Sequence, residues 1–152
     1  MTAELTTPKT IPAWRRPRIT FHPLLFAAYP VLFLWSQNLG ETSAADVLPL
    51  MAIVVAIAAA LTLVLGLVLR DVRRAALVVT PVVAGVLMYG HVETLIEPLG
   101  IRTTLQQLAW VALVGIGLVA ALRLREPALA AASRILDRVG ALLVVIALVV
   151  IV

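Results

Sequence analysis

The sequence predicts an all-α, polytopic transmembrane helical bundle, and three observations lead to this prediction. Hydrophobic residues make up 62% of the 152 residues, whereas charged residues make up only 13%. Soluble domains average about 45–50% apolar and about 25% charged residues, so a compact soluble core would leave much of this apolar surface in water. The charged residues also gather between long apolar runs. A lipid bilayer is therefore the solvent that fits this chain.

The chain opens with a polar segment, residues 1–20, which carries three prolines and four basic residues. We expect a disordered cytoplasmic tail here. The first predicted span covers residues 22–39, and Pro23 suits its first turn because a proline's missing N–H would have no helical partner there anyway. The apolar run is long and lacks a small-residue cleavage site, so we expect a retained helix rather than a cleaved signal peptide.

Three further spans are predicted from apolar runs separated by short polar connections, at residues 47–69, 75–96 and 105–122. The second predicted span has no charged residue, and about 20 apolar residues suffice to cross a 30 Å hydrocarbon core. Within this span an alanine recurs at four-residue spacing, at Ala52, Ala56 and Ala60. Such a stripe would let another helix approach closely, although alanine richness alone would also produce it.

The fifth predicted span covers residues 139–152, after a mixed segment, residues 127–138, that we expect to form a helical, amphipathic cytoplasmic connection. The 14 residues of this span make roughly 21 Å of helix, which falls short of the bilayer core. We therefore expect five spans of which the last is incomplete, in a chain whose parent continues past Val152.

The basic residues predict the orientation of these spans. If the tail is cytoplasmic and the loops alternate, Arg102 alone of the 12 basic residues falls outside, as the positive-inside rule requires. We therefore expect a multi-pass protein of the plasma (inner) membrane, with its N-terminus in the cytoplasm and its C-terminus directed outward. The lipid bilayer is the expected partner. Nucleic acid is not, because the basic residues lie at the ends of apolar runs rather than in one binding patch.

One group of polar and ionisable residues near the membrane edge is a candidate functional site: Tyr89, His91, Glu93 and Glu97. Tyr89, Glu93 and Glu97 share a helical face because they are four residues apart, whereas His91 points elsewhere. We expect structural anchoring first, a lining or docking role second, and catalysis least. A metal site needs three or four converging ligands, so we expect no metal and no cofactor. At the opposite membrane face, His22 is expected to be an interfacial anchor.

Catalytic signatures are missing from the sequence. It contains no glycine-rich phosphate loop, no GxSxG elbow, no HExxH motif and no cysteine. We therefore expect a chain that is not itself an enzyme. A transporter would need polar groups at the midplane of broken helices, and the second and fourth spans offer none, so transport is a weaker alternative. The other alternative is a small standalone scaffold that packs against a partner complex.

Several short motifs resemble the opening of a group of bacterial membrane proteins. They are FHPLLFA at 21–27, YPVLFL at 29–34 followed by Asn38, LRDVRRAA at 69–76, YGHV at 89–92 and RIL at 134–136. In that group a multi-span N-terminal module precedes a sulfatase-like domain of the alkaline phosphatase superfamily. The resemblance implies a membrane module that anchors an extracytoplasmic sulfatase-like hydrolase or transferase domain, which is not in this chain. The family's metal ligands and nucleophile belong to that later domain, so none is carried onto this sequence.

Overall fold

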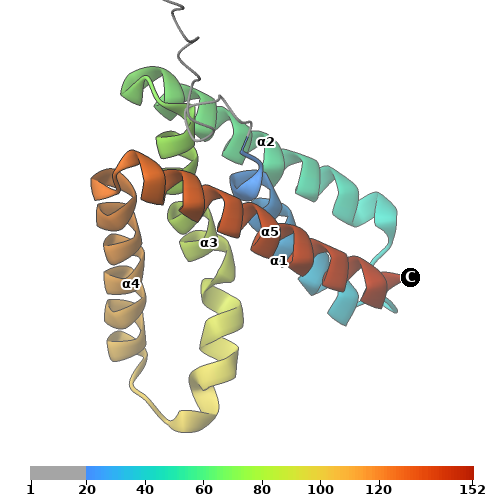
Figure 1. Cartoon of the computed structure of the whole chain (residues 1–152). Coiled ribbons are helices and arrows are strands. Elements are labelled where there is room, and N and C mark those ends of the chain that lie inside the picture. Colours follow the sequence, from blue (N-terminus) through green and yellow to red (C-terminus); the bar gives the residue numbers. More distant parts are fainter. Residues whose placement is uncertain (1–19) are drawn as a thin grey trace, which may run out of the picture.

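The computed structural model describes residues 20–152, and these residues form an all-α structure (Figure 1). This part of the chain contains α-helices, one short 3₁₀-helix and no strand, so the all-α part of the predicted fold class is confirmed there. The predicted tail, residues 1–20, lies outside the described residues except for Thr20. The elements are α1 (His22–Gln37), α2 (Ala44–Leu69), α3 (Val72–Ile96), η2 (Glu97–Leu99), α4 (Thr103–Arg123) and α5 (Glu126–Ile151).

Three of these helices are long and apolar enough to cross a membrane, namely α2, α3 extended by η2, and α4. Their large apolar side chains face outward in many places: Leu67 of α2 is 80% exposed and Val86 of α3 is 73% exposed. Monomeric soluble proteins rarely expose contiguous apolar patches of this kind. The helices therefore suit a membrane-embedded protein, as the sequence predicted.

The first and fifth predicted spans differ from these three. α1 has 16 residues, slightly fewer than the roughly 17–25 that a transmembrane helix uses. α5 has 26 residues, and the charged Arg134, Asp137 and Arg138 separate its mixed first half from its apolar second half. We expected a helical connection over residues 127–138 followed by a span over 139–152. In the structure the two segments form one continuous helix that no proline interrupts after Pro127.

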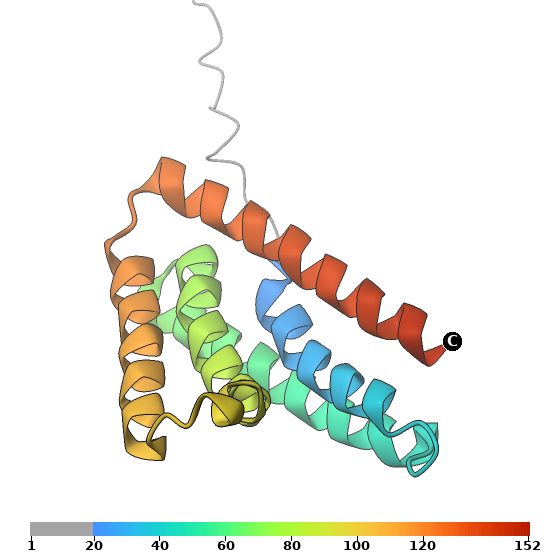
Figure 2. The same cartoon turned by 90° about the horizontal axis from the view of Figure 1, so that it is seen from below.

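The helices form two arms that diverge from a shared end (Figures 1 and 2). We call α1, α2 and α5 the first arm and the α3–α4 hairpin the second arm. The α2–α3 turn and the α4–α5 junction lie together where the arms meet. Because this shared end carries Arg70, Arg73, Arg74, Arg123 and Arg125, we call it the arginine end.

Polar contacts hold the arginine end together. The Asp71 carboxylate caps α3 by accepting a hydrogen bond from the backbone N–H of Arg74 at 3.1 Å. The Arg74 guanidinium donates to the carbonyl oxygens of Leu122 at 2.6 Å and Leu124 at 3.1 Å. The last carbonyls of a helix lack partners within it and carry partial negative charge, so a cation is favourable there. One side chain thus fixes the start of α3 against the end of α4.

Small residues allow close approach at two helix crossings. A Cβ added to Gly140 of α5 would lie 2.9 Å from Leu25 Cβ of α1, and one added to Gly117 of α4 would lie 3.1 Å from Pro81 Cβ of α3. Gly115, by contrast, faces open space. The alanine stripe of α2 is also unused within the described residues: Ala52, Ala56 and Ala60 are all exposed.

Candidate functional site

Two cavities flank the C-terminal half of α3, one facing α1 and the other facing α4. The α1–α3 groove has a volume of about 370 Å³ and is lined by Tyr29, Pro30, Phe33, Gln37, Met88, His91, Val92, Thr94 and Leu95. The α3–α4 cavity has a volume of about 550 Å³ and is lined by Tyr89, Val92, Glu93, Ile96, Ile101, Leu105, Gln106, Ala109, Trp110 and Leu113.

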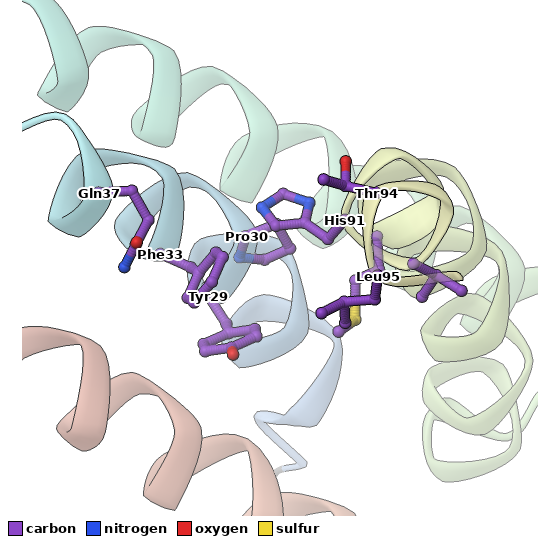
Figure 3. A pocket seen from close by; sticks show the side chains of 9 residues that line it. Tyr29, Pro30, Phe33, Gln37, His91, Thr94 and Leu95 are labelled. Carbon is purple, nitrogen blue, oxygen red and sulfur yellow. The ribbon is translucent and has the colours of Figure 1, made fainter. Parts of the chain in front are cut away.

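Aromatic rings form the wall of the α1–α3 groove. Figure 3 shows the His91 imidazole reaching from α3 toward Pro30 and Phe33 of α1. The ring centroids of His91 and Phe33 are 5.0 Å apart, and those of Phe33 and Tyr29 are 5.9 Å apart. The Nε2 atom of His91 is buried and has no hydrogen-bond partner. The groove is therefore mostly apolar, with one polar atom left unsatisfied in its wall.

The groove becomes more polar toward the C-terminal ends of its two helices. Gln37, the last residue of α1, is exposed, whereas Pro30, two turns earlier, is buried. On α3 the apolar Met88 precedes His91 and Thr94, and the Thr94 hydroxyl donates to the carbonyl of Gly90 at 2.9 Å. The open end of the groove thus carries the polar Gln37 and Thr94 together with the exposed apolar Leu95.

The α3–α4 cavity is also mostly apolar, with a few polar groups in its wall. Trp110 of α4 donates its indole N–H to the carbonyl of Gly85 at 2.8 Å, which joins the two helices of the hairpin. The rings of Trp110 and Tyr89 lie 6.3 Å apart. The Tyr89 hydroxyl is buried without a partner, and Glu93 and the buried Gln106 complete the polar part of the lining.

The four residues singled out from the sequence are not brought together in one site. Tyr89 and Glu93 line the α3–α4 cavity, whereas His91 lines the α1–α3 groove. This separation follows the helical spacing, which places His91 on a different face of α3. Glu97 begins η2, is exposed and lines neither of these two cavities. Among residues 20–152, no three His, Asp or Glu side chains gather closely enough to hold a metal ion.

His22 occupies a place that the sequence did not predict. We expected an interfacial anchor, but the side chain is fully buried and its Nδ1 lies 2.6 Å from the Thr80 hydroxyl of α3. The backbone N–H groups of Phe21 and His22 both donate to one carboxylate oxygen of Asp137 on α5, at 2.9 and 2.8 Å. These contacts join α1, α3 and α5, and we call them the polar junction.

The hydrogen-bond directions at the polar junction follow from Thr80. Its hydroxyl donates to the carbonyl of Ala76 at 2.9 Å, so the Nδ1–H of His22 donates to the hydroxyl oxygen. The Nε2 atom of His22 then carries a lone pair, and this atom is buried without a partner. A buried histidine that serves helix packing is the arrangement observed.

Sequence reasoning missed the α1 side of the groove and the α4 side of the second cavity. A signal for the first was present, since Tyr29, Phe33 and Gln37 are spaced four residues apart and so share one face of α1. Gln106 was not singled out from the sequence as a site residue. Its burial depends on how α4 packs against α3, and periodicity within one helix does not report that contact.

Comparisons with protein-family models, curated proteins and solved structures found no match to this chain. The resemblance to the membrane module of sulfatase-like proteins therefore stays a prediction.

Proposed function

We propose that this chain is an integral membrane module of the plasma membrane that anchors an extracytoplasmic sulfatase-like hydrolase or transferase domain, which is not in this chain. The observation that supports this proposal most strongly is the course of α5. This helix leaves the arginine end and carries the C-terminus along α1 to the neighbourhood of the α1–α2 connection (Figures 1 and 2). A domain attached there would lie at the face opposite the arginines.

The distribution of charge supports the orientation. Both connections at the arginine end are short and basic, and basic residues in short loops stay in the cytoplasm. The α1–α2 connection instead carries Glu41, and the α3–α4 connection carries Glu97 with a single Arg102. In our proposal the arginine end is therefore cytoplasmic, and the tips of both arms face outward.

All five helices cross the bilayer in this proposal, including the two short ones. The polar junction places α1 and α5 at the same depth in the membrane, because α1 begins at His22 and Asp137 of α5 lies beside it. Beyond this level α5 is apolar and runs next to α1. A short apolar stretch is accommodated by local thinning of the bilayer at a modest free-energy cost per ångström. The neighbouring α1 and α5 would share that thinned region.

The functional benefit of such a module is proximity. An enzyme domain tethered at the membrane meets membrane-bound substrate at a high effective concentration. This chain would contribute position, and the chemistry would lie in the attached domain.

The topology is tested by labelling single cysteines, because the chain has no cysteine of its own. Glu41→Cys, Arg125→Cys and Val152→Cys are expressed separately and treated in intact cells with a membrane-impermeant maleimide. We expect labelling at positions 41 and 152 but labelling at 125 only after permeabilisation. Protection at 152 together with labelling at 41 would contradict an outward C-terminus.

The anchoring role is tested by the mass of the native protein in membranes. We expect a mass well above the 16.2 kDa of this chain, and protease added outside intact cells should release the excess as a folded domain. His91→Ala in that full-length protein should leave its hydrolase or transferase activity unchanged.

A second candidate function is a standalone scaffold, which the exposed Ala52, Ala56 and Ala60 favour because they leave room for a partner helix. A native mass near 16 kDa, with co-purification of a larger subunit, would support the scaffold and contradict the anchor.

A further inference from the structure

The α1–α3 groove is mostly apolar, and the polar groups of Gln37, His91 and Thr94 lie toward its open end. We infer that it binds one acyl chain of a membrane phospholipid, whose ester carbonyl accepts a hydrogen bond from Nε2–H of His91. This inference rests on the proposed membrane placement. It adds a specific lipid site to a module that otherwise contacts lipid only through exposed helix faces.

In the proposed membrane placement, the lining residues lie at the depths of a phospholipid's acyl chain and of its ester group. Tyr29 and Pro30 lie two turns before the end of α1, and the groove is apolar there. Gln37 and Thr94 lie near the ends of α1 and α3, where the chain leaves the membrane in the proposed topology. His91 lies between these levels, at the depth at which ester groups follow the acyl chains.

The chemistry of His91 favours an ester carbonyl as its partner. Its Nε2 is buried and unpartnered, and a buried polar group without a hydrogen bond is costly. An ester carbonyl has no proton and only accepts, so it suits the tautomer that carries the proton on Nε2. With no cluster of three His, Asp or Glu side chains among residues 20–152, a metal ion is a poor occupant.

A partner helix fits the groove less well than a lipid. The backbone N–H and C=O groups of a membrane helix are already paired within that helix. An apolar helix face would therefore cover the groove but leave Nε2 of His91 without a partner. The groove volume of about 370 Å³ also lies within the roughly 300–1,000 Å³ of small-molecule sites.

The α3–α4 cavity supplies the contrast that the test needs. It is similar in depth and lies on the same helix, but it contains Glu93 and Gln106 beside the unpartnered Tyr89 hydroxyl. Tyr89→Phe therefore serves as a matched control, since it removes one unpartnered polar atom from the other side of α3.

The test uses vesicles that contain a phosphatidylglycerol with a diazirine close to the ester of one acyl chain. The chain is reconstituted, irradiated and digested, and the labelled residues are mapped by mass spectrometry. We expect labelling concentrated at Phe33 and Met88, above that at lipid-facing residues of α2 such as Leu67. His91→Phe keeps a ring against Phe33 but removes both nitrogens, and should lower groove labelling roughly fivefold. Tyr89→Phe should leave it unchanged.

Two outcomes would overturn the inference. Labelling spread evenly over α2, α3 and α4 would mean ordinary annular lipid, and equal effects of His91→Phe and Tyr89→Phe would remove the role of Nε2. Flotation with the vesicles separates these results from a failure of the membrane placement, because a chain that does not float overturns both proposals. If His91→Phe does not fold, Leu95→Trp at the groove rim should block labelling instead.

Discussion

The contacts at the arginine end and the polar junction differ in kind from the contact between α1 and α3 farther out. At the arginine end and the adjoining polar junction, Arg74, Asp137 and His22 make directional hydrogen bonds between helices. Farther along the arms, α1 and α3 meet through aromatic rings, as in the pair of Phe33 and His91. Directional bonds fix how helices are placed, whereas ring contacts leave room for cavities. The hydrogen bonds at the converging end thus fix how the helices are placed, whereas the ring contacts between α1 and α3 border the α1–α3 groove.

Substituting the two histidines should give the largest difference in stability between these two regions. His22→Ala should lower the free energy of unfolding by about 2–4 kcal/mol, because it leaves a buried cavity and removes the partner of Thr80. His91→Ala should cost less than about 1 kcal/mol, since that ring is only partly buried. Thermal unfolding in detergent micelles, followed by circular dichroism, measures both. Equal losses for the two variants would refute the division into a structural end and a binding region.

The carboxylate of Asp137 gives the next largest effect. Asp137→Ala should cost about 2 kcal/mol, because two backbone N–H groups at the start of α1 lose a charged acceptor. Hydrogen exchange at the amides of Phe21 and His22 should accelerate in this variant. Asp46→Ala is the control: its carboxylate accepts from Ser43 at the exposed start of α2, and its removal should change exchange only there.

Arg74 tests whether the second arm is fixed at the arginine end. Arg74→Ala should cost about 1–2 kcal/mol, since the carbonyls that end α4 lose a charged donor. Arg123→Ala changes an exposed arginine of the same end and should stay within about 0.5 kcal/mol of the unaltered chain. Unfolding in mixed micelles of increasing dodecyl sulfate content, read by tryptophan fluorescence, compares them. A neutral Arg74→Ala would show that the hairpin is placed by apolar packing alone.

Substitutions at two glycines should have the smallest effects on stability, and these effects should have opposite signs. Alanine is a better helix former than glycine by up to about 1 kcal/mol, so Gly115→Ala should stabilise α4 slightly. Gly140→Ala should instead destabilise the protein by about 1 kcal/mol, because the new Cβ would press on Leu25 Cβ at 2.9 Å. The two melting temperatures should move in opposite directions. A gain at both positions would mean that α1 and α5 are not in close contact.

The sequence predicted where the helices lie better than it predicted the contacts between them. The second, third and fourth spans were expected at 47–69, 75–96 and 105–122. The helices observed there begin two or three residues earlier and end within one residue of the predicted ends. Apolar length and the flanking polar turns determine such elements locally, because the bilayer sets the length that a span needs. The division of Tyr89 and Glu93 from His91 was also predictable, since it depends only on helical spacing.

Contacts between helices were not predictable in the same way. His22 was taken for an anchor because its neighbour Pro23 marks a helix start, and nothing local reveals Thr80 or Asp137 as partners. The charged residues before residue 139 predicted a helical cytoplasmic connection, but not that Asp137 of this segment accepts hydrogen bonds from the start of α1. A charge that is bonded across two helices has the same sequence pattern as a charge that faces water.

The contact between Asp137 and α1 also has a consequence for how the chain is made. The two residues that donate to it precede it by 116 and 115 positions. The first turn of α1 therefore lacks its cap while α2, α3 and α4 are synthesised and inserted. Only when α5 emerges does the capping carboxylate arrive, so the earliest described helix is the last to be completed.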